Sequence, residues 1–385
     1  NYHLQINGFD FITLDYRNGS RYRQFLQDTL EEIKSRADYD DGKPIFIQIH
    51  SGVNGTTTGS YQDCGNTSTY LQGTLADWPQ AIVMTAHSHY SSEVEDGIYQ
   101  DNFTVVNNGS MDYVEVDDSR TVENEVVNWV QGNLEDGHYE LTCNYITVMK
   151  DGTTVIRRFD VTNKRWMGIP WVIDTEEGKE GFRYTSGKRS TTAPWFEEDA
   201  EISVENVGET TADLVFDQAV DDQLTEYYRV TVRNFLTNED AVFKVLPENY
   251  DYAGDSSYEV TKGFTGSFDA YSRYYLRPYP EQMKFYLSDL QPNTRYRIIV
   301  QAFDSFDNAS LVKDVVFKTE GETVELPNVL PETVEDGKFL DMSFDDSSLT
   351  DSEGQITATA AGNISYEEGM DGTSPHIPSP KGAQR

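Results

Sequence analysis

Three of the six histidines in this chain follow apolar segments, and their spacing is typical of a metal site. Residues 81–84 are apolar and lead through Thr85 and Ala86 to His87 and His89. In an extended chain, residues two positions apart point to the same side, so we expect these two imidazoles to face one spot. Because neutral imidazole is a common metal ligand, the pair favours metal binding over two unrelated surface histidines.

His50 stands in the same position after a second apolar segment, residues 44–49. If the two segments are neighbouring parallel strands, all three histidines meet at the carboxyl edge of the sheet, where open α/β sheets bind ligands. The sequence therefore predicts a metal site formed by His50, His87 and His89. Taken singly, each histidine has a plainer interpretation as a hydrogen-bonded surface residue.

The segments around these histidines predict α/β structure. Asn7-Gly8 indicates a hairpin over residues 2–15, and apolar residues at helical spacing predict a helix over 21–37. A short helix is expected at 70–78, and a hairpin around Asp151-Gly152 over 138–160. Between them, residues 51–70 are rich in Gly, Ser, Thr and Asn, which is typical either of a substrate-contacting loop or of a solvated one.

The composition limits the class of protein. A chain of 385 residues predicts two to three domains. Its 66 acidic and 30 basic residues give a net charge of −36, which disfavours binding to nucleic acid or anionic membranes. No apolar stretch reaches the ~18 residues of a transmembrane helix. The two cysteines, Cys64 and Cys143, either form one disulfide or stay free.

Residues 1–180 resemble the C-terminal half of a calcineurin-like metallophosphoesterase. The resemblance is carried by His50 after its strand, by Ala86-His87-Ser88-His89, which is similar to that family's Gly-His-x-His, and by the strand-rich region that follows. It implies a four-layer α/β/β/α sandwich and two divalent metal ions, with His50 and His87 on one ion and His89 on the other. Zn, Fe, Mn and Ni all suit such ligands.

This chain departs from the family pattern in two respects. Ala86 replaces the usual Gly, and the family's earlier Asp-x-His, Gly-Asp-x-x-Asp and Gly-Asn-His motifs are absent. We therefore expect a fragment that carries about half of the two-metal site. Because half a sandwich leaves apolar sheet faces exposed, we also expect the region to be unstable alone.

The rest of the chain predicts a multidomain protein. Residues 181–198 are expected to be a linker, and 199–320 resemble a fibronectin type III domain, an all-β sandwich whose tyrosine corner would be Tyr296. Residues 321–337 form a second, acidic linker. Residues 338–385 resemble the start of a laminin G-like, concanavalin-type jelly roll, truncated before it can close a core.

Together these features predict metal-dependent hydrolysis of phosphate mono- or diesters by a modular protein outside the cell or at the surface of a bacterial cell. Its partners would be a phosphoester substrate and, through the C-terminal modules, cell-surface carbohydrate. Two alternatives stay open. One is a non-catalytic adhesion or carbohydrate-binding protein with an inactive phosphoesterase-like domain. The other is a single zinc ion held by His50, His87 and His89 with water.

Overall fold

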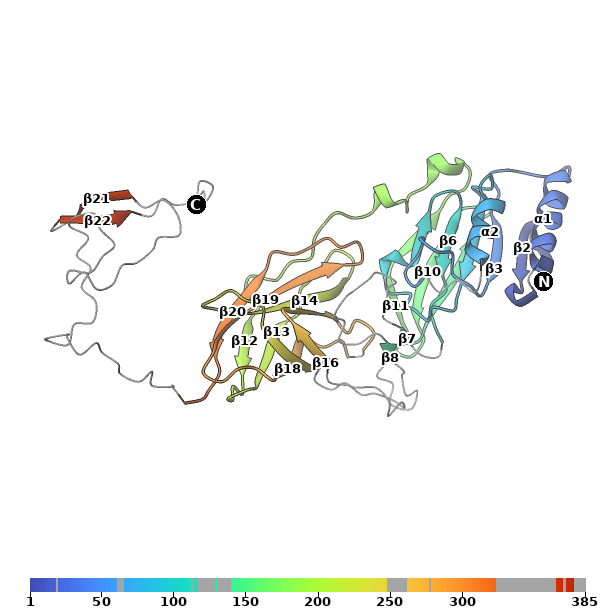
Figure 1. The fold of residues 1–385 in the computed structure, drawn as a ribbon. Helices are drawn as coiled ribbons and strands as arrows, with labels where there is room; N and C mark the ends of the chain where they lie inside the picture. Colours follow the sequence, from blue (N-terminus) through green and yellow to red (C-terminus); the bar gives the residue numbers. More distant parts are fainter. Residues whose placement is uncertain are drawn as a thin grey trace. The chain divides into compact units, whose positions relative to one another are not determined.

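The computed structural model divides the chain into two compact units, Asn1–Glu322 and Thr323–Arg385 (Figure 1). The structure describes residues 1–18, 20–60, 66–111, 114–115, 129–130, 140–247, 262–276, 278–322, 365–369 and 372–376. In the second unit these include one hairpin of β21 (Ser365–Gly369) and β22 (Gly372–His376). Most of the predicted jelly-roll start, 338–385, and most of the linker 321–337 lie outside the described residues.

The first unit begins with a six-stranded sheet in the order β1-β2-β3-β4-β6-β5. Its strands are β1 (Tyr2–Ile6), β2 (Phe9–Leu14), β3 (Ile45–Ile49), β4 (Ala81–Thr85), β5 (Ile98–Gln100) and β6 (Thr104–Asn107). Strands β2, β3, β4 and β6 are parallel, and the two outer strands are antiparallel to their neighbours. The predicted parallel pairing of the two histidine-bearing strands is thereby confirmed.

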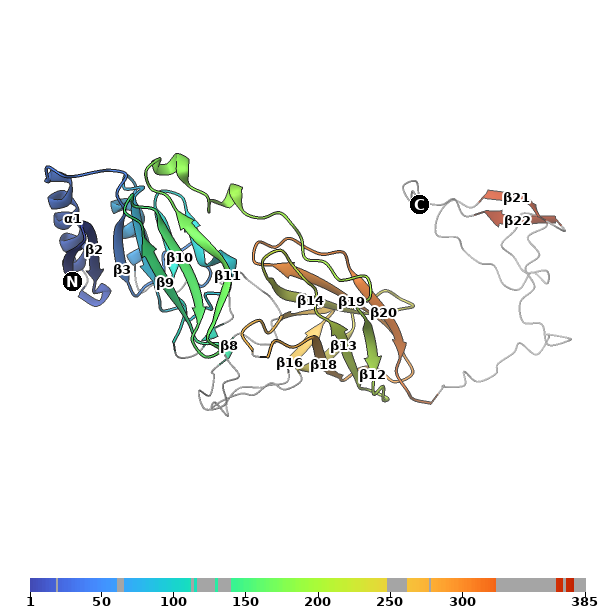
Figure 2. The ribbon, with the colours of Figure 1, turned by 180° about the vertical axis from the view of Figure 1, so that it is seen from behind.

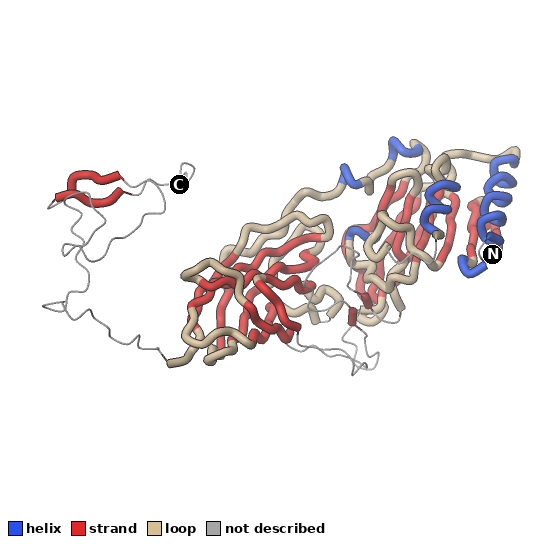
Figure 3. The backbone as a smooth tube through the Cα atoms, in the orientation of Figure 1, coloured by secondary structure: helices blue, strands red, loops and turns tan. Residues whose placement is uncertain are grey.

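The central strands β3, β4 and β6 are buried on both faces, which explains their apolar character. Ile45 and Ile47 pack with α1 (Ser20–Ser35) and α2 (Thr67–Thr74), and Figure 3 shows both helices, in blue, against the sheet. Phe46 and Ile82 face the other way, toward the second sheet.

The helix prediction for 21–37 is confirmed, whereas α2 begins and ends earlier than the predicted 70–78. Pro79 suggested the later end, but Trp78 before it packs against the same core from outside the helix.

A second sheet covers the face opposite the helices. It has the order β11-β10-β9, with β9 (Thr142–Val148), β10 (Thr154–Asp160) and β11 (Arg165–Ile173), and lies in front of the first sheet in Figure 2. The Asp151-Gly152 hairpin is confirmed. Strand β11 was not predicted, since Gly168 and Pro170 interrupt its pattern; as an edge strand it tolerates the proline. The described layers are thus α/β/β.

Short elements complete this half. They are the 3-10 helices η1 (Tyr16–Asn18), η2 (Glu95–Gly97), η3 (Gly178–Gly181) and η4 (Ser186–Lys188), and a two-stranded ladder of β7 (Val114–Glu115) and β8 (Trp129–Val130).

The other half of the first unit is an antiparallel β-sandwich, as predicted for 199–320. One sheet has the order β12-β13-β18-β15-β16 and the other β17-β14-β19-β20. The strands are β12 (Ile202–Glu205), β13 (Ala212–Asp217), β14 (Thr225–Asn234), β15 (Val242–Pro247), β16 (Lys262–Thr265), β17 (Ser267–Tyr271), β18 (Gln282–Ser288), β19 (Arg295–Asp304) and β20 (Lys313–Lys318). One apolar core joins the two sheets, so the described chain as a whole is mostly β-sheet with few helices.

Tyr296 forms the predicted tyrosine corner. Its ring is 3 % exposed, and its hydroxyl oxygen accepts a hydrogen bond from the backbone N–H of Gln291 at 2.9 Å. The bond ties the start of β19 to the turn before it.

We expect Tyr296→Phe to lower the free energy of unfolding by about 1 kcal/mol, because one backbone hydrogen bond is lost without a change in apolar volume. The measurement is urea denaturation of the full chain. Tyr145→Phe, at a position 58 % exposed, is the control; an equal effect of the two substitutions would argue against the corner.

The two halves of the first unit share a small apolar cluster. Tyr90 and Val94 from the first half pack with aromatic residues of the sandwich: Tyr227, Tyr271, Tyr274, Tyr275 and Phe303. The predicted linker 181–198 also makes contacts on both sides, since Arg189 donates to the carbonyl of Ile98 and the carbonyl of Ser190 accepts from Asn308 at 2.9 Å.

Glu140 lies fully buried at this junction. Its backbone N–H donates to the carbonyl of Tyr275 at 3.0 Å, and its carboxyl group bonds to Ser91 and lies 3.5 Å from Arg165. Burial first, and then the charge of Glu93, raise the pKa of Glu140 well above its ordinary value. The pKa of the buried Tyr274 phenol is also raised well above its ordinary value, first by burial, then by the charge of Glu226 and to a smaller extent by that of Glu140.

The folded state therefore holds the Glu140 proton more tightly than the unfolded state does. This contribution to stability is complete below the ordinary pKa of 4.5 and is lost as the pH rises toward the raised folded-state value. We expect the free energy of unfolding of the wild type, relative to Glu140→Gln, to fall as the pH rises above 4.5. Chemical denaturation across pH measures it; a constant difference between the two proteins would contradict the assignment.

Among the residues that the structure describes, no helix is both long and apolar enough to cross a membrane.

Candidate functional site

The ends of β3 and β4 bring two of the predicted histidines into contact. The backbone N–H of Ala86 donates to the carbonyl of His50 at 3.2 Å, which joins the two strand ends. Beyond this bond, Nε2 of His50 lies 2.8 Å from Nδ1 of His87, and the ring centres are 4.7 Å apart. The parallel sheet thus places these imidazoles together at its carboxyl edge, as the sequence predicts.

The segment that carries His87 and His89 is not extended. The prediction that strand alternation turns both imidazoles to the same side is therefore wrong. His87 has φ 70° and His89 has φ 52°, both in the left-handed region. The N–H of Ser88 donates to the carbonyl of Ala86 at 2.8 Å, which closes a tight turn after β4. Such backbone angles are unfavourable for residues other than glycine, and they concentrate at functional sites.

His89 contacts the end of a third parallel strand. Its Nδ1 lies 3.0 Å from the hydroxyl oxygen of Ser110, which follows β6, the neighbour of β4. Sequence reasoning missed Ser110, although the rule that selected His50 applies equally to residues after any parallel strand of this sheet. Three adjacent strand ends therefore carry two pairs of polar side chains, His50 with His87 and His89 with Ser110.

The surroundings of His50 favour its neutral form. Partial burial, and then the nearby His87, His89 and Arg17, lower the pKa of His50. The ring of Tyr16 stacks on the imidazole at 5.4 Å between centres. Neutral imidazole is the form that binds metals, and the lowered pKa of His50 is compatible with such a role.

The paired nitrogens fit one part of a metal site. Two nitrogen ligands on one tetrahedral ion stand about 3.4 Å apart when each metal–nitrogen bond is about 2.1 Å. The 2.8 Å between His50 Nε2 and His87 Nδ1 is a hydrogen-bond distance, so the two rings would have to separate slightly to hold an ion. Within the described ranges, however, no three His, Cys, Asp or Glu side chains form a group that could hold an ion. The described residues thus bring two imidazole nitrogens together, and the assignment of all three histidines to metal ions stays a prediction.

The loop after His50 is packed rather than solvated over residues 51–60, where most side chains are buried. Gly59, at φ 67°, lies directly against Ser88, and a Cβ atom at this position would stand 2.4 Å from that of Ser88. The close approach requires glycine and supports the turn between the two histidines. Residues 61–65, including Cys64, lie outside the described residues, and Cys143 is a free thiol in the structure.

Arg158 on β10 holds the chain that follows the histidines. Its side chain is 0 % exposed, and it donates to the carbonyls of Ser92 and Glu93 at 3.2 and 3.1 Å. It also forms an ion pair with Glu95 and lies 4.4 Å from the ring centre of Trp171. Sequence reasoning missed this residue, because nothing in the alternation of β10 distinguishes it from Arg157.

We expect Arg158→Lys to lower the free energy of unfolding by about 3 kcal/mol, since an ammonium group cannot replace the planar set of donors and leaves buried acceptors unsatisfied. The neighbouring Arg157, exposed on the opposite face of β10, offers a matched control: Arg157→Lys should change stability by less than about 0.5 kcal/mol. Equal losses in urea denaturation would refute the role of Arg158.

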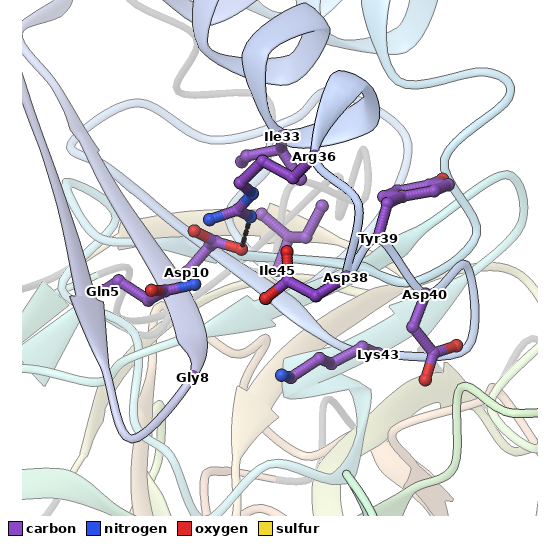
Figure 4. Close-up of a pocket in the computed structure, with 10 residues that line it drawn as sticks. All are labelled: Gln5, Gly8, Asp10, Ile33, Arg36, Asp38, Tyr39, Asp40, Lys43 and Ile45. Carbon is purple, nitrogen blue, oxygen red and sulfur yellow. Dashed lines mark hydrogen bonds and ion pairs between the residues drawn. The ribbon is translucent and has the colours of Figure 1, made fainter.

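A small pocket lies where β2 and β3 begin, at the end of β3 opposite His50 (Figure 4). Asp10 pairs there with Arg36, and Lys43 lies nearby. The pocket has a volume of about 10 Å³, enough for about one water molecule. The pocket is too small for a substrate, and the Asp10–Arg36 ion pair beside it has a structural role.

No family model and no curated protein matches the chain. Solved β-sandwich domains resemble about a third of it. The FN5 domain of Drosophila Lar is 14 % identical, with a TM-score of 0.17, over 34 % of this chain and 96 % of that one. The third fibronectin III domain of human KIAA0343 protein is 13 % identical, with a TM-score of 0.17, over 32 % and 82 %. These likenesses carry no information on function.

Proposed function

We propose that this chain supplies histidine ligands to a metal centre that hydrolyses phosphate mono- or diesters, as the resemblance of residues 1–180 to the calcineurin-like metallophosphoesterases implies. The observation that carries the proposal is the 2.8 Å approach of His50 Nε2 and His87 Nδ1 at the carboxyl ends of parallel strands. The left-handed backbone at His87 and His89 adds support, because strained residues gather at functional sites.

The side chains present have distinct tasks in this proposal. His50 and His87 would direct two nitrogens to one ion, and partial burial lowers the pKa of His50, which favours its neutral form. Ser110 orients the His89 ring through Nδ1, as outer partners of metal-binding histidines commonly do. Two bound divalent ions would lower the pKa of a water between them and stabilise the attacking and leaving oxygens of the ester. Zn, Fe, Mn and Ni remain alternatives for both ions.

The wider setting is part of the same proposal. The protein would act outside the cell or at its surface, with carbohydrate as a partner of the C-terminal modules. The net charge of −36 supports a partner other than nucleic acid.

Metal binding gives the direct test. We expect the full chain to bind Zn²⁺ or Mn²⁺, and His50→Ala and His87→Gly to weaken binding at least about 100-fold, since even outer partners of a metal site are worth 10- to 100-fold. Glycine is used at 87 because alanine would be strained at φ 70°. Isothermal titration calorimetry and elemental analysis supply the measurements.

His3, which bonds to Asp10 at 2.8 Å in the outer hairpin, is the control, and His3→Gln should bind metal as the wild type does. Equal affinity in all variants would overturn the metal centre. Hydrolysis of bis(p-nitrophenyl) phosphate by the metal-loaded chain, abolished in His89→Gly, would support the esterase. Tight metal binding without hydrolysis would favour the non-catalytic alternative.

A further inference from the structure

The residue that follows His89 connects the histidine turn to the β-sandwich. Tyr90 is 0 % exposed, and its hydroxyl donates a hydrogen bond to Oε1 of Glu226 at 2.9 Å. Its carbonyl accepts from the side chain of Asn107, at the end of β6, at 3.4 Å. Tyr90 is therefore fixed between the candidate site on one side and the sandwich on the other.

Glu226 reaches Tyr90 because of an irregularity in β14. Thr225 pairs with Asp304 and Tyr227 pairs with Phe303, so Glu226 is the extra residue of a bulge. A bulge turns a side chain out of its regular direction, and bulges of this kind often lie beside functional sites. The side chain that emerges here is a carboxylate, and it is 0 % exposed.

The buried surroundings of the Tyr90–Glu226 hydrogen bond make it important for both halves of the first unit. A buried carboxylate is unfavourable unless it accepts hydrogen bonds, and the Tyr90 hydroxyl supplies one from the other half of the unit. Around it, the aromatic cluster excludes water, with Tyr227 stacked on Phe303 at 4.7 Å and 4° between planes. In this low-dielectric setting a hydrogen bond is stronger and more sensitive to geometry than at the surface.

We propose that Glu226 is a positioning residue for the histidine site and acts through Tyr90. The hydrogen bond holds Tyr90 in place, and Tyr90 in turn fixes the backbone of the His87-Ser88-His89 turn against its unfavourable left-handed angles. The β-sandwich is then a structural part of the site and not a spacer. The role toward a metal rests on the proposed function, whereas the restraint on the turn does not.

The test uses the full chain and two measurements: Zn²⁺ affinity by calorimetry, and amide hydrogen exchange of residues 87–90 without metal. Tyr90→Phe and Glu226→Leu remove the bond, and we expect each to weaken Zn²⁺ binding about tenfold and to speed exchange in the turn by a similar factor. Glu226→Gln keeps an acceptor oxygen and should restore both values to near those of the wild type.

Tyr228→Phe is the matched control. Tyr228 is also 0 % exposed, but its hydroxyl bonds to Gln218 and Ala219 within the sandwich. It should lower stability while leaving Zn²⁺ affinity and exchange at 87–90 unchanged. Equal behaviour of Tyr90→Phe and Tyr228→Phe would overturn the proposal.

A second comparison covers the case in which Tyr90→Phe does not fold. Failure of Glu226→Gln to differ from Glu226→Leu would also overturn the positioning role. A wild type that binds no Zn²⁺ would refute the metal centre alone, and hydrogen exchange would still decide whether Glu226 restrains the turn.

Discussion

The parallel pairing of β3 with β4 is the contact on which the candidate site depends. It sets the two strand ends side by side, and the tight turn after β4 then brings His87 to His50. The pairing is itself maintained by burial on both faces, with the helices on one side and the second sheet on the other. The contact between His50 and His87 at the carboxyl edge of the sheet thus depends on apolar packing along β3 and β4.

Polar groups buried at the junction add specificity to this packing. Arg158 ties the second sheet to the chain after the histidines, and Glu140 and Glu226 tie that region to the sandwich. Each is costly to bury, and each has hydrogen-bond partners that offset part of this cost.

The sequence predicts those features that depend on local pattern. The Asn7-Gly8 and Asp151-Gly152 hairpins, the first helix, the paired strands and the Tyr296 corner all follow from periodicity and turn chemistry. The gathering of His50 and His87 follows from one rule about strand ends. Ser110, Arg158 and Glu226 could not be selected in the same way, because their importance comes from partners far away in the chain. The left-handed turn at His87 reflects tertiary packing against Gly59, which no local propensity encodes.

The distance along the chain between Tyr90 and Glu226 has a consequence for synthesis. The two residues are separated by 136 positions, so the histidine turn leaves the ribosome long before its partner exists. Chains are made at about 5–20 residues per second, and domains tend to fold as they emerge. The parallel sheet can form first, but the turn at its edge acquires its final support only after β14 has been made. Assembly of the site is thus coupled to completion of the sandwich. A nascent chain that ends before β14 has the His87-Ser88-His89 turn without the hydrogen bond from Tyr90 to Glu226.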